Sequence, residues 1–66
     1  MNQIRNLRER ANLTQDVLAQ LIRVDRSTIA KWETGKALPR ADKLLELAKI
    51  LGCTVDELLK NTETTS

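Results

Sequence analysis

The 66-residue chain contains no histidine, no phenylalanine and no tyrosine, and its single tryptophan is Trp32. Without histidine, a histidine-dependent catalytic triad is excluded. One cysteine, Cys53, provides neither the ligand set of a zinc site nor an internal disulfide. Clustered acids and a glycine-rich phosphate loop are also missing. We therefore expect no enzyme, no metal site, no cofactor and no small-molecule substrate.

Glycine and proline are scarce, with two glycines and one proline, and runs of β-branched residues are absent. This composition favours helices over a β-sandwich or barrel. Hydrophobic residues make up 41% and charged residues 30%, which is typical of a compact domain rather than a disordered chain. A single small all-α domain is expected, and a core of this size is marginal enough for a partner chain to add stability.

Long hydrophobic runs are absent too, and no stretch approaches the roughly 20 residues needed to span a bilayer. The segment 1–6 lacks the apolar region of a signal peptide. We expect a cytoplasmic protein without a membrane partner. The domain is expected over residues 1–60, followed by a polar, disordered tail over 61–66.

Charge is unevenly distributed, although the net charge is only +2. Residues 23–43 contain six Lys or Arg against three Asp or Glu, whereas residues 44–66 contain two against four. An anionic partner is therefore expected at the middle of the chain.

Hydrophobic periodicity predicts five helices, at about 2–10, 15–22, 26–33, 40–51 and from 54 onward. Thr14 and Asp25 are candidate N-caps, and Thr54 with Glu57 matches a capping box. Gly35 and Gly52 are typical helix-ending residues. Because about three residues join the second and third helices, these must cross steeply, as in a helix-turn-helix.

The third helix has two different faces. On a helical wheel, Ile29 and Trp32 fall on one side with Asp25 and Thr28, and the opposite side carries Arg26, Ser27, Ala30 and Lys31. The second face has short side chains and two long cations, so it fits a major groove about 12 Å wide. The alternative is an ordinary solvated surface, and Trp32 is assigned to the core.

Motifs along residues 2–60 resemble the Cro/repressor-type helix-turn-helix family, also called the xenobiotic-response-element family. The matching segments are Leu13-Thr14-Gln15, Leu18-Ala19, Arg26-Ser27-Thr28-Ile29, Lys31-Trp32-Glu33, Gly35-Lys36 and Val55-Asp56-Glu57-Leu58-Leu59, together with Ile4-Arg5, Leu7-Arg8, Val24, Pro39 and the leucine pattern of 44–52. The resemblance implies a compact five-helix, lambda-repressor-like domain that binds double-stranded DNA.

The resemblance also implies roles for individual residues. Bases are contacted by Arg26, Ser27, Ala30 and Lys31, and the DNA backbone by Gln15, Thr34, Lys36, Arg40 and Lys43. Surface solubility is the alternative for Lys36, Arg40 and Lys43. Arg8 and Glu33 are implied to form a structural ion pair between the first and third helices.

Three positions depart from the family pattern. Arg23 replaces the usual glycine of the turn, at a cost of about 1 kcal/mol if the backbone there has a positive φ. Val17 replaces an acidic residue, so Thr14 lacks a reciprocal capping partner. Asp25 replaces a common serine and places a negative charge near phosphate.

These observations predict a transcriptional regulator, with repression as its expected role, that binds DNA as a homodimer. Val55, Leu58 and Leu59 are the candidate dimer contacts, and burial against the fourth helix is their alternative. With no ligand-sensing segment expected, control is attributed to concentration, dimerisation or a protein partner. The competing hypotheses are a phage or mobile-element repressor, a restriction controller, an antitoxin that also binds a toxin, and a protein–protein adaptor.

Overall fold

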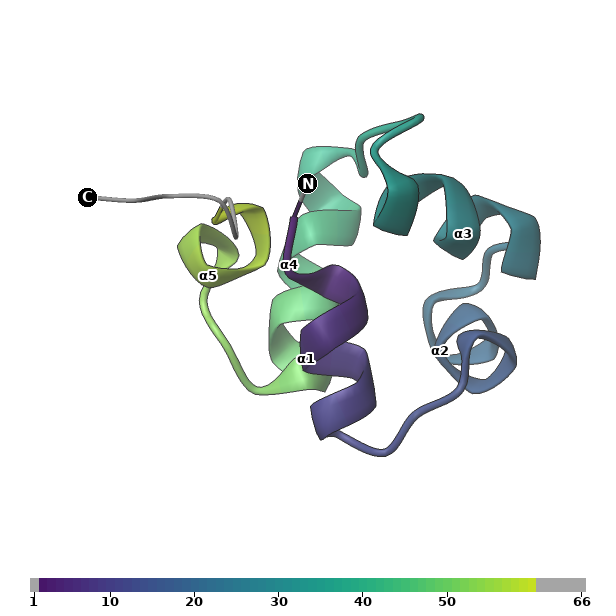
Figure 1. Cartoon of the computed structure of the whole chain (residues 1–66), viewed down its shortest axis with the longest axis horizontal. Coiled ribbons are helices and arrows are strands. Elements are labelled where there is room, and N and C mark those ends of the chain that lie inside the picture. Colours follow the sequence, from purple (N-terminus) through teal and green to yellow (C-terminus); the bar gives the residue numbers. More distant parts are fainter. Residues whose placement is uncertain (1, 61–66) are drawn as a thin grey trace.

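The computed structural model describes residues 2–60, and the predicted tail over 61–66 lies outside this range. Within it there are five helices and no strand, which confirms the all-α prediction. Figure 1 shows α1 and α4 at the centre, with α5 on one side and α2 and α3 on the other. The helices are α1 (Ile4–Arg10), α2 (Gln15–Ile22), α3 (Arg26–Thr34), α4 (Ala41–Leu51) and α5 (Val55–Leu59).

Local sequence signals explain most helix ends. The Thr14 hydroxyl accepts a hydrogen bond from the Val17 N–H at 3.1 Å, and Thr54 forms the complete capping box with Glu57. Gly35 and Gly52 end α3 and α4 with positive φ. Asp25 occupies the N-cap position of α3 with an extended backbone, as expected, but its side chain makes no capping hydrogen bond.

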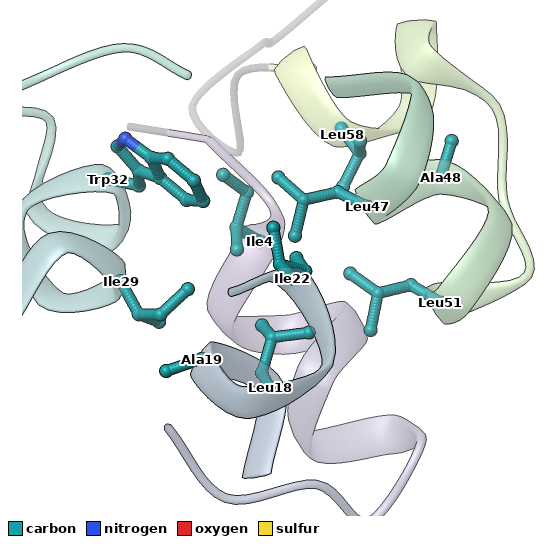
Figure 2. Packing of buried hydrophobic residues seen from close by; sticks show 10 residues of the cluster. All are labelled: Ile4, Leu18, Ala19, Ile22, Ile29, Trp32, Leu47, Ala48, Leu51 and Leu58. Atoms are coloured by element: carbon teal, nitrogen blue, oxygen red, sulfur yellow. The ribbon is translucent and has the colours of Figure 1, made fainter. Parts of the chain in front are cut away.

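The hydrophobic core takes residues from all five helices. Figure 2 shows their side chains converging between the helices. Trp32 is buried, as expected, and Val24 in the turn packs against the cluster. The ten buried members are Ile4, Leu18, Ala19, Ile22, Ile29, Trp32, Leu47, Ala48, Leu51 and Leu58. Because every helix contributes to this core, the orientation of α3 is set by packing along its inner side.

The turn between α2 and α3 is short and firmly held. Arg23 adopts the left-handed conformation, with φ 67° and ψ 47°, and the Val24 N–H donates to the Ala19 carbonyl at 3.0 Å. Ala19 is almost fully buried, and because its side chain is only a methyl group, α2 and α3 can approach closely there. The Lys43 ammonium on α4 donates to the Ile22 carbonyl at 2.8 Å, and this hydrogen bond joins α4 to the C-terminal end of α2.

Candidate nucleic-acid interface

The outer face of α3 is open to solvent along its whole length. Arg26, Ser27 and Lys31 are exposed and Ala30 is partly buried, whereas Ile29 and Trp32 on the opposite side are buried. The helical wheel thus placed Ile29 and Trp32 correctly, whereas Asp25, which it placed on the same side, is exposed. The backbone of α3 cannot rotate to hide the cations without removing Ile29 and Trp32 from the core.

A buried ion pair joins α1 to the end of α3. Arg8 Nε lies 2.6 Å from Glu33 Oε2, and their side chains are 10% and 4% exposed. Arg8 Nη1 also donates to the Leu13 carbonyl at 2.7 Å. No buried side-chain nitrogen or oxygen lacks a hydrogen-bond partner in the part of the chain that the structure describes. A charge pair this deep is tolerated because its remaining hydrogen-bonding groups are satisfied.

Gln15, the first residue of α2, connects this buried pair to the surface of α3. Its Nε2 donates to Glu33 Oε1 at 2.9 Å, and its Oε1 accepts from Arg26 Nε at 3.5 Å. The sequence predicted only a phosphate contact for Gln15, and it did not indicate the contacts with Glu33 and Arg26. They depend on how α2 and α3 cross, which no local pattern specifies.

Asp16 is a second residue that the sequence did not connect with the site. Its Oδ1 lies 3.7 Å from Arg26 Nε, and both side chains are about two-thirds exposed. The available signal was an acid in the first turn of one helix and a cation at the start of the next, in two helices joined by a short turn.

A depression of about 620 Å³ lies where α1, α2 and α3 meet. Eight of its ten lining residues are polar or charged, among them Arg5, Thr14 and Thr34. The Thr34 hydroxyl donates to the Ala30 carbonyl at 3.0 Å, so it must rotate away from that carbonyl before it can donate to a phosphate oxygen, which only accepts.

The predicted phosphate-binding cations divide into two groups. Lys36 and Arg40 are exposed on the connection between α3 and α4, and neither forms an ion pair within residues 2–60. Lys43 differs, because its ammonium binds the Ile22 carbonyl and lies 3.8 Å from Glu46 Oε1. Its charge is committed to the C-terminal end of α2, and we do not retain it as a phosphate contact.

The residues expected at a dimer surface are also separated by the structure. Leu58 has no exposed surface and belongs to the core, so it is not available to a partner. Leu59 is 44% exposed and Val55 is partly buried.

Cys53, which lies near this surface, is partly buried, and burial, together with the charge of Glu57, raises the pKa of its thiol. A thiol with a raised pKa is a weak nucleophile, in agreement with a packing role.

Comparison with known proteins decides the family. A family model described as "Helix-turn-helix" matches residues 4–58. The chain belongs to this helix-turn-helix family. The match extends from the start of α1 to Leu58 of α5, so it spans the residues of the ion pair, the turn and the outer face of α3. The resemblance to Cro/repressor-type proteins is thereby confirmed.

Three curated relatives of this helix-turn-helix chain are named as transcription factors. The chain is 42% identical over 60 residues to the HTH-type transcriptional activator BcrR of Enterococcus faecalis, covering 91% of this chain and 29% of the relative. It is 35% identical over 57 residues to repressor protein C2 of Salmonella phage P22, covering 86% and 26%. It is 33% identical over 63 residues to the cryptic phage CTXphi transcriptional repressor RstR of Vibrio cholerae, covering 96% and 57%.

The helix-turn-helix chain thus spans between about a quarter and just over half of the length of these relatives. Among its described residues, no helix has the length and apolar character to cross a membrane.

Proposed function

We propose that the chain binds double-stranded DNA and regulates transcription, with α3 placed in the major groove. The observation that carries this proposal is the division of α3 into an exposed face with Arg26, Ser27 and Lys31 and a buried face with Ile29 and Trp32. A rigid helix that presents cations and short side chains outward has the shape and charge of a recognition helix. All three relatives carry names of transcription regulators.

Each side chain on this face has a chemical role in base recognition. Arg26 lies at the first residue of α3, and its guanidinium can donate two hydrogen bonds to guanine O6 and N7. Ser27 can bond either a base or a phosphate, and the Ala30 methyl suits contact with a thymine methyl. Lys31 lies one turn further along the same groove. We propose these four as the base-contacting residues.

Phosphates on either side of the groove are proposed to meet Gln15, Thr34, Lys36 and Arg40. Gln15 is at the N-terminus of α2, where unpaired N–H groups and the helix dipole favour an anion. Lys36 and Arg40 follow α3 directly and carry exposed charges. Such contacts set the register of the protein on the duplex, while the bases determine which sequence is bound.

Repression by a homodimer is the proposed mode of action. Two of the three relatives are named repressors and one is named an activator. One recognition helix reads few base pairs, and two copies reading half-sites about 34–36 Å apart extend the site. The exposed Leu59 and the partly buried Val55 are proposed as the contact between copies. In Figure 1 α5 lies at the end of the molecule opposite α3, so this contact leaves the reading face free.

Selection of bound duplexes from a random pool tests the proposal directly. We expect a preferred sequence with two-fold symmetry, and Arg26→Ala should lose about tenfold or more in affinity for it, with a much smaller loss on random DNA. Arg10→Ala is the matched control, since Arg10 is an exposed cation on α1 outside the depression. Equal losses on both kinds of DNA contradict base reading, and affinity that does not change with salt indicates a protein–protein adaptor instead.

A further inference from the structure

Arg26 is the base-reading cation of the proposed function, and in the free protein it already lies beside an acid. Its Nε lies 3.7 Å from Asp16 Oδ1, and the two side chains are 67% and 68% exposed. An exposed pair of this kind contributes little to folding stability. Its effect is on the position of the guanidinium relative to the groove.

Gln15 provides a hydrogen-bond acceptor for the same nitrogen. The Glu33 carboxylate accepts from Gln15 Nε2 at 2.9 Å, and an ionised carboxylate can only accept. The amide nitrogen must therefore face Glu33, which leaves Gln15 Oε1 directed outward, 3.5 Å from Arg26 Nε. Because the Glu33 side chain is 4% exposed and also paired with Arg8, a buried group fixes this orientation.

Asp16 and Gln15 both approach the Nε edge of Arg26, while neither of its Nη groups forms a hydrogen bond within residues 2–60. Bidentate recognition of guanine requires a pair of N–H groups directed at O6 and N7. Restraint at Nε thus leaves the Nη end free to donate, and it reduces the number of rotamers that the side chain must lose on binding.

We infer that Asp16 is a specificity-determining residue that positions Arg26 for one base and opposes binding where that base is missing. The inference rests on the proposed DNA-binding function. When Arg26 bonds a guanine through its Nη groups, Nε stays beside Asp16 and the carboxylate stays neutralised. When Arg26 turns instead toward a phosphate, Asp16 is left as an unpaired negative charge at the start of α2, close to the DNA backbone, and repels it.

The test compares Asp16→Asn with Asp56→Asn. Asp56 is also exposed in a first helical turn, but on α5, so both variants change the net charge equally. For Asp16→Asn we expect affinity for random DNA to rise about fivefold and the preference for guanine over adenine at the Arg26 base pair to fall about fivefold. Asp16→Glu should restore most of that preference, and Asp56→Asn should leave it unchanged.

An NMR measurement on the free protein decides the pairing without DNA. The Arg26 Nε–Hε signal should shift, and its exchange with water should accelerate, in Asp16→Asn and not in Asp56→Asn. An unchanged Arg26 signal, or an unchanged base preference in Asp16→Asn, overturns the inference. Failure of the wild-type protein to select any DNA sequence would instead contradict the proposed function, and the NMR result would still show whether Asp16 holds Arg26.

Discussion

At Arg23 the backbone is left-handed, with φ 67°, and the residue ends α2 where the family usually has glycine. A side chain in this region costs about 1–2 kcal/mol, and the greater freedom of glycine in the unfolded chain offsets part of that cost. We expect Arg23→Gly to raise the free energy of unfolding by about 0.5–1 kcal/mol in urea titrations.

Arg10→Gly is the control for this substitution, because Arg10 has helical geometry in α1. The same change of side chain should there lower the free energy of unfolding by about 1 kcal/mol. If both variants lose stability equally, the left-handed backbone of Arg23 is not strained.

The role of a single residue could be predicted where it depends on neighbours in the sequence, and not where it depends on a contact with another helix. The glycine that the family usually has in the turn left open whether φ is positive at Arg23, and the structure shows that it is. A helical wheel placed Trp32 in the core, where it lies. The contacts of Asp16, Gln15 and Lys43 were missed, since each involves a partner on another helix. Such contacts follow from crossing angles and side-chain reach, and sequence spacing contains neither.

Helical elements were largely predictable, because their ends are specified by short-range chemistry. The expected start and end of α2 agree with the structure, and α1 begins two residues later than expected. Thr14 and Asp25 show the limit of this reasoning, since both have N-cap backbone angles but only Thr14 accepts a hydrogen bond. Whether a suitable side chain actually caps depends on its rotamer, which the residue type does not determine.

This difference predicts unequal costs of substitution at the two caps. Thr14→Ala removes the hydrogen bond from the Val17 N–H and should lower the free energy of unfolding by about 1 kcal/mol. Asp25→Ala removes only a favourable charge at the start of α3 and should cost about 0.5 kcal/mol or less. Thermal and urea unfolding of both variants provide the comparison, and a larger loss for Asp25→Ala contradicts the cap geometry described here.

For the whole molecule, charge and packing are arranged along one direction. The basic segment that follows α2 includes α3 and its exposed cations, and the acidic segment includes α5 at the other end (Figure 1). The order of charges along the sequence indicated the two segments, and the fold places α3 and α5 on opposite sides of the molecule. The core that links the two ends draws on all five helices, so a local change in α5 can be tested separately from the reading face.

The salt dependence of DNA binding counts both phosphate contacts and copies of the chain. Each lost phosphate contact reduces the slope of log affinity against log salt by about 0.9. Lys36→Ala should therefore reduce the slope by about 1.8 if two copies occupy the selected site, and by about 0.9 if one does.

Lys49 is an exposed cation in the last turn of α4, and Lys49→Ala should leave the slope unchanged. Lys43→Ala should also leave it unchanged while lowering stability, because its ammonium bonds the Ile22 carbonyl. A reduction near 0.9 for Lys36→Ala contradicts the homodimer, and no reduction removes Lys36 from the DNA interface.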